Sequence, residues 1–215
     1  SLGCRFESYC GDQTSKENTM VSFIGDVHGK WWSYHDIIST RYNTYQVGDF
    51  GVGFPGSFNL PEMWKTMDKG FHRFIRGNHD NPDYCKSNPY CIGDGDLVDN
   101  IFFMGGAESI DRGLRTPGYD WWPDEEVKLT KFLDYVLPNY MLGGFNIVVT
   151  HDCPRSVAKD LFDVDSNSTT RHMLQILFDE YQPDLWVFGH WHRSTRKKIN
   201  GTEFVCLAEL EVLDL

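Results

Sequence analysis

The sequence lacks two features that would place it among membrane or nucleic-acid proteins. No apolar run approaches the roughly 20 residues that cross a bilayer, and no stretch resembles a signal peptide. Basic residues are not in excess, since 20 lysines and arginines stand against 31 acidic residues, giving a net charge of -11. Nonspecific nucleic-acid affinity depends on basic side chains, so we expect neither a membrane protein nor a general polyanion binder. A local contact with a nucleic-acid end stays open.

Paired cysteine motifs are also lacking. The six cysteines, at positions 4, 10, 85, 91, 153 and 206, form no CxxC pair and no disulfide-like spacing. This pattern favours a reduced chain in the cytoplasm. The alternative is that Cys85 and Cys91, which flank a short loop, pair in an oxidising compartment.

The composition is sufficient for one compact domain, which we place at residues 20–215. The chain has 215 residues, of which 40% are hydrophobic, enough for one continuous core. Residues 1–19 are polar and aperiodic, and Met20 stands directly before the first apolar run. Two interpretations of residues 1–19 remain: a genuine N-terminal arm, or an upstream or expression-derived segment.

Short apolar runs alternate with helix-compatible stretches along the chain. The runs at 21–24, 44–47, 71–75, 147–149 and 185–188 have the length and Val, Ile and Phe content of buried strands. Helices are predicted at about 31–40, 61–69, 124–136 and 169–180. Pro123 followed by three acidic residues suits the start of the third helix. This alternation predicts an α/β sandwich in which strand ends converge at one edge.

A chemically distinctive residue follows each of these apolar runs. The motifs are Gly25-Asp26-Val27-His28-Gly29, Gly48-Asp49, Gly77-Asn78-His79-Asp80, His151 and Gly189-His190-Trp191-His192. Mixed imidazole and carboxylate ligands suit manganese, iron or zinc, whereas magnesium and calcium prefer oxygen almost alone. Together the motifs offer enough ligands to hold two divalent ions beside a phosphate ester.

This ordered series, which spans residues 25–192, resembles the calcineurin-like metallophosphoesterase superfamily, in particular its small bacterial and phage members. The resemblance implies a β-sandwich flanked by helices, a four-layer αββα fold with metals at the C-terminal strand ends. It also implies two divalent transition-metal ions, with manganese favoured over iron or zinc. By this resemblance Asp26, His28 and His192 bind the first ion, Asn78, His151 and His190 bind the second, and Asp49 bridges both.

The implied reaction is hydrolysis of a phosphate monoester or diester by a hydroxide that bridges the two metals. His79 resembles the family histidine that faces the leaving group, and Asp80 is a candidate to orient it. The alternative for Asp80 is a helix cap before Pro82. The expected substrate is a nucleotide, a nucleic-acid end or a phosphorylated small molecule. A catalytically silent binding scaffold on the same fold is the alternative function.

The sequence departs from the serine/threonine protein phosphatase branch of the superfamily. That branch carries an arginine after the second motif and after the Gly-Asn-His motif, and neither is present here. We therefore expect substrate arginines from the segment after residue 105, namely Arg112 or Arg115. Trp121 and Trp122 could stack on a base or wall off the cleft. The alternative for this segment is a surface salt bridge and a hydrophobic lid. The sequence leaves the oligomeric state open.

Overall fold

Two β-sheets pack face to face in the structure, a computed structural model that describes residues 20–55, 57 and 61–215. The expectations about residues 1–19 lie outside this part. The four-stranded sheet has the order β10-β1-β2-β3, with β1 (Val21–Ile24), β2 (Asn43–Gln46), β3 (Phe71–Phe74) and β10 (Val212–Asp214). The six-stranded sheet has the order β4-β5-β6-β7-β9-β8, with β4 (Leu97–Val98), β5 (Ile101–Met104), β6 (Ile147–Thr150), β7 (Leu185–Phe188), β8 (Thr195–Ile199) and β9 (Thr202–Cys206).

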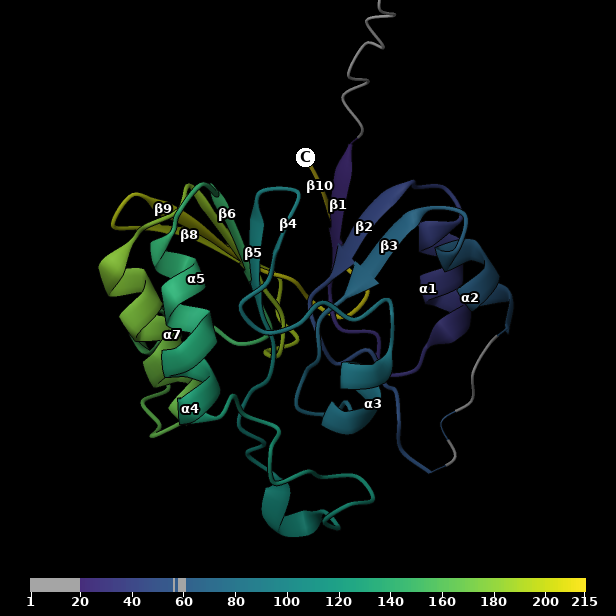
Figure 1. Cartoon of the computed structure of the whole chain (residues 1–215), viewed down its shortest axis with the longest axis horizontal. Helices are drawn as coiled ribbons and strands as arrows, with labels where there is room; N and C mark the ends of the chain where they lie inside the picture. Colours follow the sequence, from purple (N-terminus) through teal and green to yellow (C-terminus); the bar gives the residue numbers. More distant parts are fainter. Residues whose placement is uncertain (1–19, 56, 58–60) are drawn as a thin grey trace, which may run out of the picture.

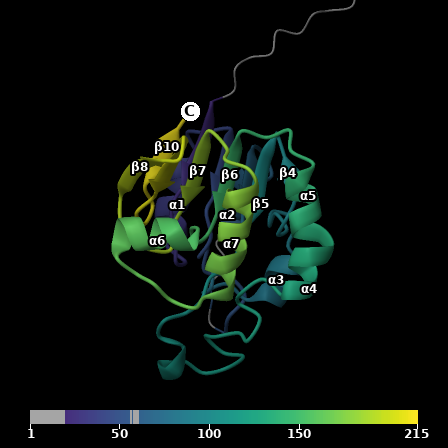
Figure 2. The ribbon, with the colours of Figure 1, turned by 90° about the vertical axis from the view of Figure 1, so that its left-hand side faces the viewer.

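Helices cover the outer faces of both sheets (Figure 1). On the side of the four-stranded sheet lie α1 (Trp31–Ile38), α2 (Pro61–Met67) and, near the strand ends, α3 (Pro82–Ser87). The six-stranded sheet is covered by α4 (Leu129–Lys131), η2 (Phe132–Val136), α5 (Leu137–Met141), α6 (Arg155–Phe162) and α7 (Thr169–Glu180), as Figure 2 shows. This order of helix, sheet, sheet and helix confirms the expected four-layer architecture.

The hydrophobic core is divided among the three interfaces between layers. Between the sheets, Phe23 and Tyr45 of the four-stranded sheet pack with Phe103 and Val187 of the six-stranded sheet, and all four are buried. Separate buried clusters fill the space between each sheet and its helices. The parallel strands are therefore covered on both faces, which explains why the sequence shows continuous apolar runs instead of alternation.

Residues 105–125, here called the insert, form a lobe that projects beyond the strand ends (Figure 1). The lobe includes the short helix η1 (Arg112–Leu114). Its base is fixed to the body, because Arg76 donates to the carbonyl oxygens of Asp124 and Glu125, and Asn78 Nδ2 donates to Ser109 Oγ. The predicted helix start after Pro123 is therefore wrong. Residues 123–126 form turns and bends instead, and the helix begins only at Leu129.

The strands predicted from apolar runs are confirmed within one residue at each end, whereas other elements were not predicted. The missed elements include β4, β5 and helix α6. Among the described residues no helix combines the length and the apolar character needed to cross a membrane. Within the same part of the chain, Cys85, Cys91, Cys153 and Cys206 are free thiols.

Candidate metal centre

The C-terminal ends of parallel strands from both sheets meet at one edge. Strands β1, β2 and β3 run parallel and lead into Asp26, Asp49 and Asn78, while β6 and β7 lead into His151 and His190. Two groups of potential ligands result: Asp26, His28, Asp49 and His192, and then Asp49, His151 and His190. Within each group the ligand atoms lie within 4.8 Å of one another, and Asp49 belongs to both.

The first group brings two imidazole rings against two carboxylates. His192 Nε2 lies 3.2 Å from Asp26 Oδ2, and His28 Nε2 lies 3.8 Å from both Asp26 Oδ2 and Asp49 Oδ2. The Nε2 atoms of His28 and His192 are 2.9 Å apart. Four nitrogen and oxygen atoms thus converge on one small volume, as ligands of a common cation do.

The two histidines of the second group converge on the side-chain oxygen of Asn78. His151 Nδ1 lies 2.9 Å from the carbonyl oxygen of Val47, which turns Nε2 toward the site. This Nε2 lies 3.3 Å from Asp49 Oδ1 and 3.1 Å from Asn78 Oδ1. His190 Nδ1 is also 3.1 Å from Asn78 Oδ1. The structure thus brings together all seven residues predicted as metal ligands.

Asp26, Asp49 and His151 are buried, so the charges on these side chains interact strongly with one another. Burial alone would raise the pKa of Asp49, but the charges of His151, His79 and His28 hold that pKa well below its ordinary value. Burial would lower the pKa of His151, yet Asp49 raises it to about 10. Asp26 and Asp49 are at most 1% exposed. Buried carboxylates need positive partners, so divalent cations fit this donor set.

The backbone at the strand ends adopts a conformation that L-residues rarely take. Positive φ angles occur at four residues of the two groups: His28 (47°), Asp49 (53°), His190 (68°) and His192 (50°). Such strain persists only where the surrounding structure enforces it, and it clusters at functional sites. The strain therefore supports a functional role for this edge of the sheets.

Two motif glycines let the backbone approach the buried carboxylates. A Cβ atom on Gly77 would lie 2.0 Å from Asp49 Oδ1, and one on Gly189 would lie 2.1 Å from Asp26 Oδ1. No side chain fits at these distances. The spacing of glycine and ligand in the motifs therefore reflects a steric requirement of the site.

Asp80 holds loops together and does not contact the His79 ring in the described structure. Its buried carboxylate accepts four backbone N–H groups, those of Phe50, Gly51, Val52 and Gly77, at 2.6 to 3.1 Å. These bonds tie the loop after β2 to the loop after β3. The geometry differs from the predicted orienting contact, and the helix cap before Pro82 is supplied by Asn81 instead.

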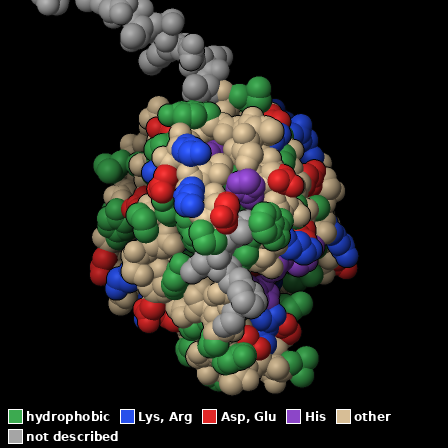
Figure 3. All heavy atoms as spheres, turned by 90° about the vertical axis from the view of Figure 1, so that its right-hand side faces the viewer, with side chains coloured by type: hydrophobic (Ala, Val, Ile, Leu, Met, Phe, Trp, Pro, Cys, Tyr) green, Lys and Arg blue, Asp and Glu red, His purple; other side chains and the backbone are tan. Residues whose placement is uncertain are grey.

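His79 lies at the rim of the two groups, beside a pocket of about 220 Å³. Its backbone N–H donates to Asp49 Oδ1 at 2.8 Å, and its side chain is 25% exposed. Burial lowers its pKa, which Asp49 opposes and Arg115 reinforces. The pocket is lined by His28, Gly51, Phe54, His79, Arg115, Asp120 and Trp122. In Figure 3 histidine side chains reach the surface above the projecting lobe.

The two arginines predicted to bind substrate have different surroundings. Arg115 donates twice to Asp111, at 2.7 and 2.8 Å, and its Nη2 also lies 3.2 Å from His79 Nε2. Arg112 has a side chain 59% exposed, and its Nη1 lies 3.8 Å from Glu108. The structure therefore brings Arg115 to the site and places Arg112 in a surface ion pair. Trp122 is buried against the pocket.

Sequence reasoning missed Ser109 and Glu125 as residues of this centre. The side-chain amide of Asn78 donates to Ser109 Oγ at 3.0 Å, and this hydroxyl in turn donates to Glu125 Oε2. Asn78 and Ser109 are 31 positions apart in the chain, and no motif spacing connects them. Only the folded insert reveals the contact.

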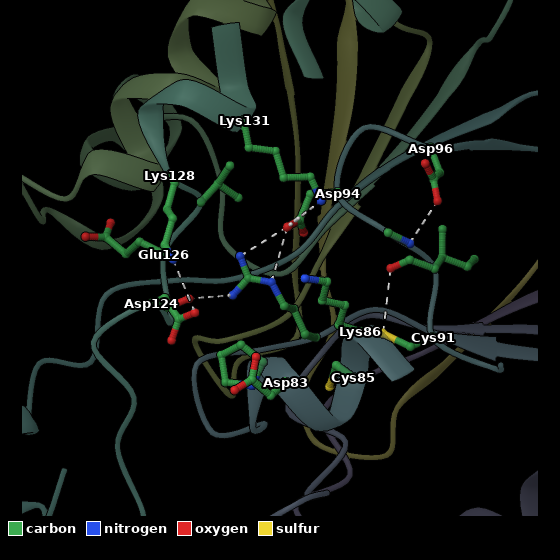
Figure 4. Close-up of a pocket in the computed structure, with 15 residues that line it drawn as sticks. Asp83, Cys85, Lys86, Cys91, Asp94, Asp96, Asp124, Glu126, Lys128 and Lys131 are labelled. Carbon is green, nitrogen blue, oxygen red and sulfur yellow. Dashed lines mark hydrogen bonds and ion pairs between the residues drawn. The ribbon is translucent and has the colours of Figure 1, made fainter. Parts of the chain in front are cut away.

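A separate pocket of about 470 Å³ lies between α3 and the segment that leads into α4 (Figure 4). At its floor Arg76 binds Asp94, with Nη2 and Oδ2 3.2 Å apart, and Lys131 approaches the same oxygen at 3.5 Å. Lys86 of α3 faces this pocket, and Asp124 lies on the opposite wall. None of its lining residues belongs to the two ligand groups.

The sequence model of the calcineurin-like phosphoesterase family matches residues 20–194. The chain therefore belongs to the calcineurin-like phosphoesterase family, as the motif series predicted. No curated protein sequence matches the chain significantly.

Solved structures that resemble this chain have little sequence in common with it. A Staphylococcus aureus protein assigned as a 5′-nucleotidase superimposes with a TM-score of 0.52 at 13% identity, over 90% of this chain and 50% of its own. GAP50, titled the anchor in the inner membrane complex of Plasmodium, gives 0.50 at 12% identity, over 88% and 72%. Phosphopantetheinyl hydrolase from Mycobacterium tuberculosis gives 0.46 at 10% identity, over 88% and 89%. The chain thus spans half the length of the Staphylococcus protein.

Proposed function

We propose that this chain is a dinuclear metal-dependent phosphoesterase. In this proposal Asp26, His28 and His192 hold one ion, Asn78, His151 and His190 hold the other, and Asp49 binds both. The observation that carries the proposal is the position of Asp49, whose two carboxylate oxygens face different ligand groups. Two cations about 3.5–4 Å apart repel each other, and a shared anion offsets that repulsion.

The ions would supply Lewis-acid polarisation of the phosphate and would lower the pKa of a coordinated water. Manganese is the proposed ion, with iron or zinc as alternatives, because the donor set mixes imidazole with carboxylate. The chain itself provides buried anionic charge that is fixed before substrate arrives. Asp80 supports this arrangement by holding the loops after β2 and β3 in register.

His79 and Arg115 form the proposed substrate side of the site. Arg115 would bind the phosphate, since a guanidinium matches phosphate geometry with paired donors. His79 Nε2 would then deliver a proton to the departing oxygen. In the structure Arg115 Nη2 points at this nitrogen. Proton delivery therefore requires that the arginine turn from the ring to the phosphate.

The proposed substrate is a small phosphate ester, such as a nucleotide, a nucleic-acid end or a phosphorylated metabolite. The pocket beside His79 supports this choice, because it combines one arginine with the aromatic rings of Phe54 and Trp122. Aromatic walls favour a planar group next to the phosphate. The fold likeness to the Staphylococcus protein assigned as a 5′-nucleotidase agrees with a nucleotide substrate.

The decisive experiment is a metal-reconstituted activity panel. The purified chain, loaded with Mn²⁺, is assayed on p-nitrophenyl phosphate, bis-p-nitrophenyl phosphate, cyclic nucleotides and short RNA and DNA ends. We expect turnover of at least one ester, abolished by Asp49→Ala and strongly slowed by His79→Ala. Asp36→Ala is the matched control, because the Asp36 side chain is 86% exposed. Normal turnover by folded Asp49→Ala would contradict the shared-ligand mechanism.

The alternative function is a binding scaffold that has the fold without catalysis. It is supported by the likeness to GAP50, described as the anchor in the inner membrane complex of Plasmodium. The same panel separates the two functions. A chain that binds Mn²⁺ but hydrolyses none of the esters would favour the scaffold.

A further inference from the structure

The side chain of Asn78 can present either its oxygen or its NH₂ group to the histidines. The two orientations have nearly the same shape, so the hydrogen-bond partners decide between them. In the structure Oδ1 lies 3.1 Å from both His151 Nε2 and His190 Nδ1, and Nδ2 points to Ser109 Oγ at 3.0 Å. Only the oxygen can coordinate a metal ion, so this orientation matters.

Ser109 has a hydroxyl whose proton is already committed. Its Oγ donates to Glu125 Oε2 at 2.5 Å, and its backbone N–H donates to Glu125 Oε1 at 2.9 Å. Both residues are at most 3% exposed. A carboxylate only accepts, so the hydroxyl must donate to it. Ser109 Oγ can therefore only accept from Asn78, which places the NH₂ group on the serine and the oxygen on the histidines.

The main chain around Glu125 is itself anchored. The Arg76 guanidinium donates to the carbonyl oxygens of Asp124 and Glu125, and Asp94 binds the same guanidinium. Asp124 and Asp94 both line the pocket drawn in Figure 4. The Glu125 carboxylate is thus a fixed acceptor, and it does not depend on the rest of the projecting lobe.

We propose that Ser109 and Glu125 are positioning residues that set the polarity of the Asn78 amide. The chain of bonds runs from the Glu125 carboxylate through the Ser109 hydroxyl to Asn78 Nδ2. It aims Oδ1 at the place where His151 and His190 converge. The consequence for metal binding rests on the proposed function, whereas the orientation of the amide does not.

Two variants test the polarity in different ways. Ser109→Ala removes the acceptor for Asn78 Nδ2. Glu125→Gln keeps the shape of the side chain but reverses the direction of the hydrogen bonds. The Ser109 N–H will bind the glutamine oxygen, which leaves the glutamine NH₂ facing Ser109 Oγ. The serine hydroxyl is then free to donate to Asn78, which favours the flipped amide. A merely structural role for Glu125 would tolerate this isosteric change.

A matched control is available a short distance away. Ser168 Oγ donates to Glu126 Oε1 at 2.9 Å and is equally buried, but it caps α7 and has no contact with the ligand groups. Ser168→Ala therefore removes the same kind of serine–glutamate bond. Any effect that Ser109→Ala shares with this control reflects stability alone.

The first readout uses protein without metal. Nuclear magnetic resonance follows the side-chain NH₂ signals of Asn78, identified through Asn78→Asp. We expect slowed hydrogen exchange in the unsubstituted chain and in Ser168→Ala, and faster exchange with shifted signals in Ser109→Ala and Glu125→Gln. Unchanged Asn78 signals in both test variants would overturn the proposal, whatever the metal content of the protein.

The second readout is Mn²⁺ binding measured by titration calorimetry. We expect Ser109→Ala and Glu125→Gln to weaken one of two sites by about 10- to 100-fold, the usual effect of removing a residue that orients a ligand. Ser168→Ala should match the unsubstituted chain. Equal Mn²⁺ affinity in both test variants would overturn the positioning role. If the unsubstituted chain bound no Mn²⁺, the proposed function would fail, and the amide signals would still decide the orientation.

Discussion

Arg115 Nη2 lies 3.2 Å from His79 Nε2, although the two residues are 36 positions apart in the chain. The contact brings an arginine of the insert to the rim of the candidate metal centre. In the loops after β2 and β3 no arginine follows the motif, whereas the serine/threonine protein phosphatase branch has one after each. In the proposed function, the insert therefore supplies from another direction the cationic group that binds the phosphate ester.

Arg115→Ala should reduce kcat/KM by about 10- to 100-fold, since losing a hydrogen bond to a charged group costs about 1.5–3 kcal/mol. The measurement is steady-state turnover of the best ester from the activity panel. Arg112→Ala is the control, because Arg112 lies in an exposed pair with Glu108 and should change kcat/KM little. Equal losses in both variants would show that the insert acts as a whole and that Arg115 has no specific role.

Asp80→Ala should destabilise the fold as well as the site. Four buried backbone N–H groups would lose their acceptor, and each unsatisfied donor costs about 1–3 kcal/mol. We expect urea unfolding to show a loss of at least about 3 kcal/mol on the same scale. Asp83→Ala, at an exposed position two residues after the helix cap Asn81, should be nearly neutral. A neutral Asp80→Ala would show that water replaces the carboxylate.

Arg171→Met should be strongly destabilising. Arg171 is 1% exposed, donates from Nε to Asp152 at 2.7 Å, and stacks over the Trp191 ring between the two histidines of the last motif. Removing one partner of a buried ion pair costs about 3–5 kcal/mol. Lys197→Ala, which breaks the exposed pair with Asp160, should cost less than about 1 kcal/mol. Similar unfolding free energies for the two variants would contradict this difference.

Asp94 should make stability depend on pH. Burial would raise its pKa, but Arg76 and Lys131 lower it below the ordinary value. The folded state thus binds the proton less tightly than the unfolded chain, so the stabilisation is fully present above the unfolded pKa of about 3.9. It is lost as the pH falls through the lower folded pKa. Asp94→Asn should therefore destabilise at pH 7, and the difference should shrink below about pH 4. A difference that is constant across this range would exclude the ion pair as its source.

Much of the site could be predicted because local sequence carries its chemistry. Each ligand-type residue follows an apolar run, and parallel strands bring their C-terminal ends to one edge. The motif glycines mark places where a side chain would collide with a buried carboxylate, as Gly77 would with Asp49. These signals lie within short segments of the sequence, so the sequence alone predicts them.

Contacts made by the insert could not be predicted in the same way. Glu125 looked like part of a helix start, because an acidic run after proline favours one. In the fold its carboxylate accepts a hydrogen bond from Ser109 and its carbonyl oxygen accepts one from Arg76. These contacts outweigh the local propensity to start a helix. Likewise, Asp80 is next to His79 in the sequence, but in the fold its carboxylate accepts four backbone N–H groups from the loops after β2 and β3.

The sequence by itself determined the family, the layered fold and the residue types at the strand ends, because strand patterning and motif spacing are local properties. Only the tertiary structure decided which arginine reaches His79, what Asp80 binds and which way the Asn78 amide points. Those outcomes depend on long-range packing of the insert and of the loops after β2 and β3 at the sheet ends, and hydrogen-bond partners from distant segments produce no periodic pattern in the sequence.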